Sequence, residues 1–205
     1  MVKYQGLENE ERSNKLTVER TSYYIINAIT LYRLVASFLL LYLIITDQYD
    51  IFKWLLVLSF FTDLIDGWLA RKFKVNTKLG AIFDSIADDL TVLVAVIGLF
   101  VFKPEFIRQN YMPLVILFVV FLVQMIFALI RYGKISSFHT YLAKLAAILQ
   151  GVFLILIYFL SEWPMVLFYV AVGVTFLELL EEIIIIALKP KWETDVKGLY
   201  WVLKK

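Results

Sequence analysis

The chain has 205 residues, of which 61% are hydrophobic and 19% are charged, and its mean hydropathy is +0.80. This is more apolar surface than a single soluble core can bury, which excludes an ordinary soluble domain. The net charge of +2 gives no sign of a nucleic-acid partner, and the absence of cysteine excludes disulfide bonds and thiolate chemistry. We therefore expect a protein that is embedded in lipid.

Residues 1–20 are polar and charged throughout. They predict a cytosolic lead-in, which is either a helix lying on the membrane surface or a disordered segment. The apolar run that follows is too long for the core of a cleavable signal peptide, so we expect no such signal.

Six apolar stretches of about 20 residues follow, each long enough to cross the roughly 30 Å hydrocarbon layer of a bilayer. Backbone amides inside a bilayer must be satisfied within the segment, and these runs show no strand alternation, so helices are expected. The sequence predicts an all-α integral membrane protein, a six-helix bundle that occupies residues 21–188 as one domain. The expected spans are Tyr24–Thr46, Lys53–Ala70, Leu79–Phe102, Met112–Ile130, Thr140–Leu160 and Pro164–Leu188.

Lysine and arginine are distributed unevenly between the expected loops. With a cytosolic N-terminus, fifteen of them fall in cytosolic segments, and only Lys53, Lys103 and Arg108 fall on the opposite side. By the positive-inside rule, both termini should face the cytosol. We expect a multi-pass protein in the inner or plasma membrane of a bacterium or archaeon.

The segment 189–205 follows the last expected span. Pro190 stops the helix, and Trp192, Tyr200 and Trp201 stand among five lysines. Aromatic and basic residues in such a mixture are typical of an interfacial tail on an anionic leaflet. We expect a cytosolic anchor here and not a site of chemistry.

Four aspartates fall within 26 residues of the second and third expected spans: Asp63, Asp66, Asp84 and Asp88. Spacings of three and four residues put each pair on one helix face. A charged residue inside a bilayer costs about 2.5–3.5 kcal/mol on insertion scales, so four carboxylates need a compensating cation. Asp63 lies eight residues before Arg71 and Asp88 eight after Gly80, so at 1.5 Å per residue both should reach about 12 Å below the cytosolic surface.

Carboxylate oxygens that converge from adjacent helices suit hard cations such as Mg²⁺, Mn²⁺ or Ca²⁺. Small residues and Arg71 beside them leave space and positive charge for a diphosphate. A single Asp–Arg pair near a helix end is usually a structural ion pair, but four aligned carboxylates fit that account poorly. A helix–loop–helix calcium site is excluded, because Leu64 and Ile65 fall where such loops need polar ligands. The residues predict a metal–diphosphate site that opens to the cytosol.

The aspartates belong to a longer pattern, which reads Asp63-x2-Asp66-Gly67-x2-Ala70-Arg71-x8-Gly80-x3-Asp84-x3-Asp88. The pattern resembles the signature of the CDP-alcohol phosphatidyltransferase family at every fixed position, and the six-helix layout extends the resemblance over nearly the whole chain. The resemblance implies that Asp63, Asp66 and Asp84 bind metal. It implies that Asp88 completes the metal site and acts as the catalytic base. The implied CDP-binding residues are Asp63, Asp66, Gly67, Ala70, Arg71 and Gly80.

The family transfers the phosphatidyl group of a CDP-lipid, CDP-diacylglycerol, to the hydroxyl of a small alcohol, with release of CMP. The resemblance implies a phospholipid-synthesis enzyme with a divalent metal cofactor, Mg²⁺ or Mn²⁺, and two such ions would stabilise both the attacking and the departing oxygen. The expected partners are the CDP-lipid, the alcohol acceptor, membrane lipids and a second copy of the chain in a homodimer.

The acceptor alcohol is indicated less clearly. Asn27, Thr30 and Arg33 resemble the N-x2-T-x2-R pattern of phosphatidylglycerophosphate synthases, although a helix start with one snorkelling arginine would look the same. Cations near the cytosolic ends of the fourth and fifth spans suit a phosphorylated acceptor such as glycerol 3-phosphate, although topology alone also places lysines there. These candidate acceptor-binding residues are Arg131, Lys134 and Lys144. The run 136–140 departs from the pattern of glycerophosphate acceptors, which leaves inositol, serine and other free alcohols open.

Three glutamates, Glu178, Glu181 and Glu182, share a face of the last span and need partners there. We expect pairing with Arg33 or Lys144.

Acidic residues in spans also mark cation transporters, but the outer halves of the spans hold no row of acidic residues that would continue a cation pathway across the membrane. An aspartate-rich isoprenoid transferase would resemble a longer chain with a second aspartate motif. The residues favour an enzyme with a one-sided site.

Overall fold

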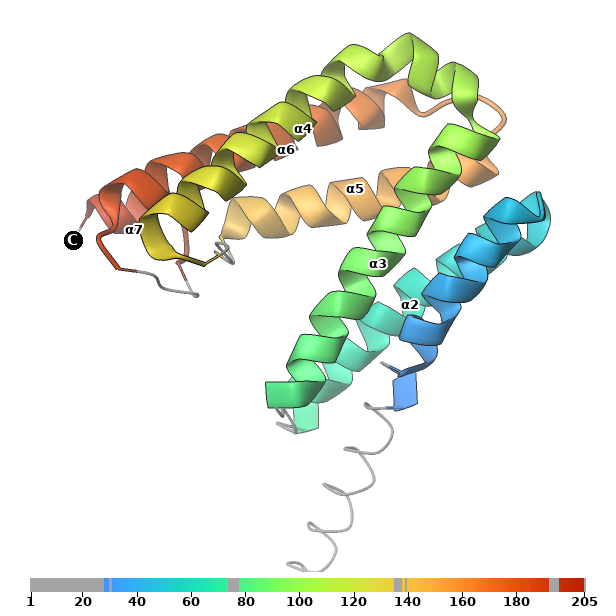
Figure 1. The fold of residues 1–205 in the computed structure, drawn as a ribbon, viewed down its shortest axis with the longest axis horizontal. Coiled ribbons are helices and arrows are strands. Elements are labelled where there is room, and N and C mark those ends of the chain that lie inside the picture. The colour runs from blue at the N-terminus through green and yellow to red at the C-terminus, as the bar shows by residue number, and fades with distance from the viewer. Residues whose placement is uncertain are drawn as a thin grey trace, which may run out of the picture. The chain divides into compact units, whose positions relative to one another are not determined.

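The computed structural model describes residues 28–29, 31–73, 78–134, 138, 140–191 and 196–204, and within its helices the side chains at 64, 66–85 and 89 are outside the description. All regular elements in these ranges are helices (Figure 1). The chain divides into two compact units, residues 1–102 and 103–205, and each is described by itself. The lead-in over residues 1–20 and the two residues Asn27 and Thr30 lie outside the described ranges, so the predictions for them stay predictions.

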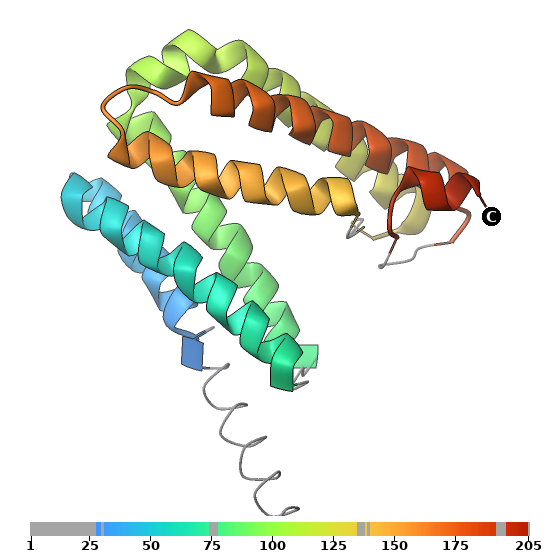
Figure 2. The ribbon, with the colours of Figure 1, turned by 180° about the vertical axis from the view of Figure 1, so that it is seen from behind.

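The first unit consists of a helix over Leu31–Ile45, then α2 (Tyr49–Phe73) and α3 (Lys78–Phe102). The turn between the first two helices is tight: the amide of Gln48 donates to the carbonyl of Leu43 over 2.9 Å. Asp47 has a positive φ of 55° there, which aspartate tolerates better than most residues. The two helices therefore lie side by side, as Figure 2 shows from behind.

Buried apolar residues close the first unit at the end that contains this turn. The ring of Phe52 is fully buried, and it lies 5.2 Å, centroid to centroid, from Phe102 at the end of α3. The ring of Tyr49 lies at the same 5.2 Å from Phe102, nearly edge to face. Leu40, Leu56 and other aliphatic side chains extend this core along the helices. The ring contacts hold the start of α2 against the end of α3.

The second unit consists of α4 (Pro104–Tyr132), α5 (Tyr141–Phe159), α6 (Met165–Leu188) and the short α7 (Leu199–Leu203). Helix α6 packs against both α4 and α5. Phe106 is fully buried, and its ring centroid lies 5.1 Å from Phe168 and 5.5 Å from Trp163. These rings join the start of α4 to the α5–α6 turn.

Helix α4 begins earlier than the expected span Met112–Ile130. It starts at Pro104, and a kink with non-helical backbone angles occurs at Asn110. Pro113 has no amide hydrogen to bond the carbonyl four residues before it, so the helix bends on its N-terminal side. The segment from Pro104 to Asn110, which we expected to be an outer loop, is thus a further helical stretch.

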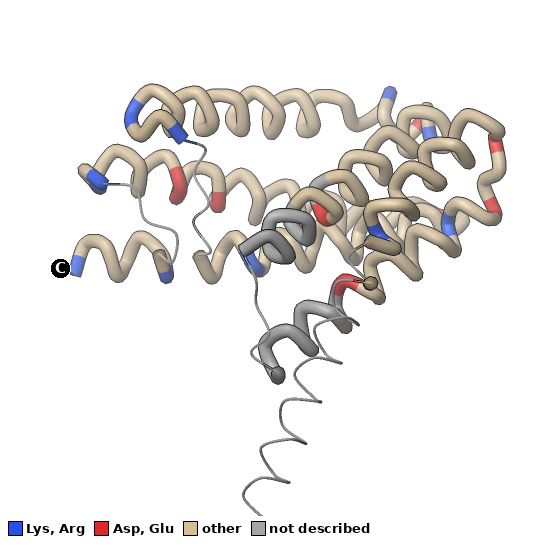
Figure 3. Tube along the Cα trace, turned by 60° about the horizontal axis from the view of Figure 1, so that its bottom comes forward, with Lys and Arg blue, Asp and Glu red and all other residues tan. Residues whose placement is uncertain are grey.

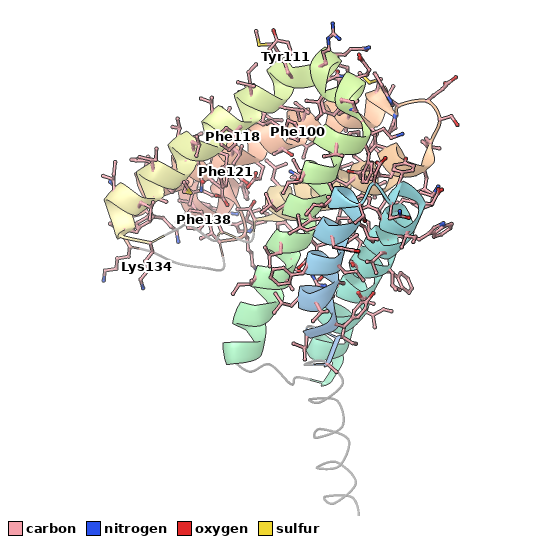
Figure 4. The ribbon with its side chains drawn as sticks, turned by 45° about the vertical axis from the view of Figure 1, so that its right-hand side comes forward. Phe100, Tyr111, Phe118, Phe121, Lys134 and Phe138 are labelled. Carbon is pink, nitrogen blue, oxygen red and sulfur yellow. The ribbon has the colours of Figure 1, made fainter. Side chains whose placement is uncertain are left out.

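Many large apolar side chains are exposed along the helices, as expected for a protein in lipid. Phe118 and Phe121 project from α4 (Figure 4), where they are 61% and 45% exposed. Lysine and arginine gather mainly toward the helix ends (Figure 3). Within the described residues, α4 and α5 are long and apolar enough to cross a membrane, and the helix Leu31–Ile45 is apolar but shorter. The all-helical fold is confirmed for the described residues, and the count of six spans stays a prediction.

Candidate metal and substrate site

Arg33 joins two of the predicted metal-binding aspartates. Its Nη1 lies 2.9 Å from Oδ1 of Asp63, and its Nη2 pairs with Oδ1 of Asp88. Arg33 is 1% exposed, whereas the side chains of Asp63 and Asp88 are 36% and 41% exposed. Two carboxylates from α2 and α3 therefore converge on one buried guanidinium from the preceding helix.

Small buried side chains allow the three helices to approach at this point. Ala36 and Ala87 are at most 2% exposed. Ser59 and Thr91 are buried next to the aspartates along the chain, and their hydroxyls bond carbonyls of their own helices over 3.0 and 2.8 Å. Because these hydroxyls are satisfied locally, they do not compete for the guanidinium. The carboxylates are left to bind Arg33 or another cation.

The convergence of Asp63 and Asp88 fits a hard metal ion. Oxygen atoms from two helices reach one point, and carboxylate oxygens are the ligands that Mg²⁺ and Mn²⁺ prefer. Asp66 and Asp84 stand in the same helices, one turn away, but their side chains are not described. Among the described side chains, no three acidic or histidine residues gather in a metal-sized group. The four-aspartate site stays a prediction that the convergence of two of its members supports.

The predicted CDP-binding residues lie on either side of the α2–α3 connection. Gly67, Ala70 and Arg71 belong to the last turns of α2, and Gly80 belongs to the first turn of α3. Their side chains are outside the description, so their role in binding CDP is still predicted from the motif.

The predicted acceptor residues all belong to the second unit. Arg131 donates from Nε to the carbonyl of Lys189 and from Nη2 to that of Ala187, both over 3.2 Å. These two carbonyls lie in the last turn and at the C-cap of α6. Carbonyls at that end of a helix have no amide partner within the helix. Lys134 lies just after α4 ends (Figure 4), and the Nζ of Lys144 lies 5.6 Å from the ring centroid of Tyr141. Arg131 therefore stabilises the end of α6, which makes Lys144 and Lys134 the better candidates for an acceptor.

The glutamates of α6 have partners other than the two basic residues we expected. Oε2 of Glu182 accepts a hydrogen bond from Nε2 of Gln124 over 2.5 Å, and both side chains are buried. Oε1 of Glu181 accepts from the amide of Leu199 over 2.8 Å. An isolated polar residue in an apolar run is the signal that would have identified Gln124, since a buried amide needs a partner.

Comparison with protein families decides the family of the chain. The family described as CDP-alcohol phosphatidyltransferase matches residues 23–177, well over half of the sequence. The chain belongs to the CDP-alcohol phosphatidyltransferase family. Members of this family generally use divalent metals, and the family implies a CDP-lipid and an alcohol as substrates.

Curated proteins that are similar to this chain carry related names. A CDP-diacylglycerol–glycerol-3-phosphate 3-phosphatidyltransferase of Rickettsia typhi is 37% identical over 97 residues, which cover 47% of this chain and 52% of the relative. An enzyme of the same name from Aquifex aeolicus is 30% identical over 79 residues, covering 38% of this chain and 44% of the relative. A cardiolipin synthase (CMP-forming)/mitochondrial hydrolase fusion protein of Schizosaccharomyces pombe is 36% identical over 75 residues, 34% of this chain and 13% of the relative. The chain thus spans about half the length of the first of these relatives, and no solved structure matches it.

Proposed function

We propose that this protein transfers the phosphatidyl group of CDP-diacylglycerol to the hydroxyl of a phosphorylated polyol, most simply glycerol 3-phosphate, and releases CMP. The observation that supports it most directly is the convergence of Asp63 and Asp88 on one buried cation at the position of the family's metal site. The names of the bacterial relatives favour glycerol 3-phosphate over a free alcohol.

In the proposed reaction, the acceptor hydroxyl oxygen attacks the lipid-linked phosphorus as the bond from that phosphorus to the CMP oxygen breaks. The hydroxyl proton passes to the carboxylate of Asp88, a role that is typically worth about 10²–10⁴-fold in rate. Divalent metal held by Asp63, Asp66, Asp84 and Asp88 would stabilise negative charge on the attacking and leaving oxygens. Gly67, Ala70 and Gly80 would leave space for the nucleotide, and Arg71 would bind its diphosphate.

Arg33 would act as a fixed counter-charge for this site. Its guanidinium is always protonated and is buried between α2 and α3, whereas the two carboxylates that it binds are partly exposed. It would therefore hold Asp63 and Asp88 at a fixed separation, each through its Oδ1. We infer that the resemblance of Arg33 to a phosphatidylglycerophosphate synthase pattern reflects this support, not direct binding of the acceptor.

We further propose Mg²⁺ or Mn²⁺ as the metal, a homodimer as the assembly, and a multi-pass topology with the site facing the cytosol. The excess of lysine and arginine in the segments assigned to the cytosol supports this orientation. Cytosolic access is also needed by the acceptor and the released nucleotide, because glycerol 3-phosphate and CMP are charged and do not cross a bilayer unaided.

Purified protein is expected to release CMP from CDP-diacylglycerol when Mg²⁺ or Mn²⁺ and glycerol 3-phosphate are both present. The assay should compare glycerol 3-phosphate with inositol, inositol phosphate, serine and glycerol, each with and without a metal chelator. Release that needs metal and a phosphorylated polyol would support the proposal. Turnover with serine or a neutral polyol alone would overturn the acceptor, and metal-dependent hydrolysis without any acceptor would overturn the transfer reaction.

Replacing Lys144 by alanine is expected to raise the KM for glycerol 3-phosphate by about 10- to 100-fold, because a charge-assisted hydrogen bond to phosphate is worth about 1.5–3 kcal/mol. The KM for CDP-diacylglycerol should change little, and Lys134→Ala should give a smaller effect in the same direction. Lys53, whose side chain is 21% exposed and pairs with Asp50 over 2.6 Å, offers a matched control. Equal effects of Lys144→Ala on both substrates, or none, would contradict a phosphate-binding role.

A further inference from the structure

Residues 196–204, which follow α6 in the chain, pack on the second unit. Val196 is 5% exposed, and with Leu199 and Val202 it contacts one apolar cluster. The other members of this cluster are Phe127, Ala128, Tyr132, Phe138, Ile185 and Ile186. We call residues 196–204 the C-terminal strap. It packs against Ile185 and Ile186 at the end of α6 and against Phe138, which precedes α5.

Glu181 attaches the strap to α6 through its backbone. The amide of Leu199 at the start of α7 has no carbonyl partner within its own helix, and Oε1 of Glu181 accepts its hydrogen bond over 2.8 Å. Gly198, just before it, has a φ of 149°, and a Cβ there would stand 3.1 Å from that oxygen. Both the conformation and the contact require glycine. The other oxygen, Oε2, is buried and makes no hydrogen bond to the described residues.

Two further contacts lead from the strap to the predicted acceptor lysine. The carbonyl of Lys197 accepts from the amide of Tyr141 over 3.2 Å, and the ring of Trp201 lies 5.5 Å from that of Tyr141. The ammonium of Lys144 lies over the ring of Tyr141, 5.6 Å from its centroid. The strap thus holds the residue against which Lys144 rests.

We propose that Glu181 is a positioning residue that docks the C-terminal strap over the start of α5, and that the docked strap orients Lys144 toward the phosphate of the acceptor. The part of the inference that concerns the acceptor rests on the proposed function, in which the acceptor is a phosphate monoester. It assigns a role to Glu181, because a glutamate without a partner would be costly in a bilayer. It also assigns a role to the C-terminal strap, which lies beyond the residues 23–177 that match the family. The amide oxygen of a glutamine at position 181 would accept the hydrogen bond from Leu199 equally well, because Oε2 of Glu181 receives no hydrogen bond from the described residues.

Docking can be measured without activity, because the chain has no cysteine. A single cysteine at the buried Val196 should react slowly with a maleimide, whereas one at Leu203, which is 66% exposed, should react fast. Adding Glu181→Ala is expected to speed labelling of Val196→Cys by about tenfold or more, because opening no longer breaks a charge-assisted hydrogen bond. Glu181→Gln keeps an acceptor oxygen and should leave labelling slow. Continued protection in Glu181→Ala would overturn the attachment.

The positioning role is tested on the acceptor side. Glu181→Ala, Gly198→Ala and Trp201→Ala should each weaken glycerol 3-phosphate binding, by calorimetric titration and by KM, about three- to tenfold. Trp201→Phe should restore it, and the KM for CDP-diacylglycerol should change by less than about twofold. If Glu181→Ala folds poorly, Gly198→Ala still tests the role, because it loosens the strap without changing Glu181. A released strap with unchanged acceptor affinity would overturn the positioning role. A wild-type protein that neither binds glycerol 3-phosphate nor releases CMP would overturn the proposed function and this acceptor role, while the labelling still decides the docking.

Discussion

Replacing Asp63 by asparagine is expected to abolish turnover and to weaken the binding of both Mn²⁺ and CDP. The amide keeps the size of the side chain but removes the anionic oxygen that a hard cation prefers. It also removes a charged acceptor of Arg33, whose Nη1 lies 2.9 Å from that carboxylate. A hydrogen bond to a charged group is worth about 1.5–3 kcal/mol, so the buried guanidinium should hold Asp88 less firmly as well. Calorimetric titration of CDP in the presence of Mn²⁺, beside a CMP-release assay, measures both effects.

Asp50→Asn is the matched control for this variant. Asp50 stands in the first turn of α2, is 85% exposed and pairs with Lys53 within the described part of the chain. The variant therefore tests the effect of one fewer carboxylate on the same helix. The control should bind CDP and Mn²⁺ as the parent does. Wild-type affinity for both ligands in Asp63→Asn would remove Asp63 from the metal site and leave its pairing with Arg33 as a structural ion pair.

The helical fold and the pairing of α2 with α3 could be predicted from sequence because both depend on local pattern. Apolar length predicts helices in a bilayer, and spacings of three and four residues predict which aspartates share a face. That Asp63 and Asp88 would approach the same point followed from their equal distance to the helix ends. The structure confirms the helices and brings these two residues to one cation.

The partners of the buried polar groups were harder to predict, because they depend on how helices that are distant in sequence turn toward each other. Arg33 was expected to pair with the glutamates of α6, and among the described residues it pairs with Asp63 and Asp88. Glu182 was expected to need a cation, but the neutral amide of Gln124 satisfies it. Hydrophobic periodicity says which face is buried, but not which donor an adjacent helix presents to it.

The packing of the tail on the second unit could not be predicted for a similar reason, and its place at the membrane interface stays a prediction. Aromatic residues beside lysines are typical of an interfacial anchor, and composition alone does not separate that case from a segment that packs on protein. The signal was Gly198, whose positive φ lets the chain turn back onto α6, with Val196 and Leu199 spaced to reach the apolar cluster. A glutamate in the last span without a cation nearby in sequence was the second signal, since it needed a donor from elsewhere.

Asp88→Asn is expected to separate binding from rate. Asparagine keeps the shape and one oxygen that can face a metal, so CDP and Mn²⁺ should still bind, while loss of the proton acceptor should lower the rate of CMP release by at least about 10²-fold. Since Asp88 also pairs with Arg33, the variant should lose some thermal stability, and binding should be measured on protein that is monodisperse by size exclusion.

Asp89→Asn is the control for this second variant, because it changes an adjacent carboxylate about 100° around the same helix. It should retain both binding and turnover. If Asp88→Asn keeps near-normal turnover, the proton acceptor is another group or water, and the base assignment is wrong. If it loses CDP binding as fully as Asp63→Asn does, Asp88 acts mainly as a metal ligand. A loss of rate with binding retained is the result that a base held in place by Arg33 requires, because the guanidinium fixes one carboxylate oxygen and leaves the other to take the proton.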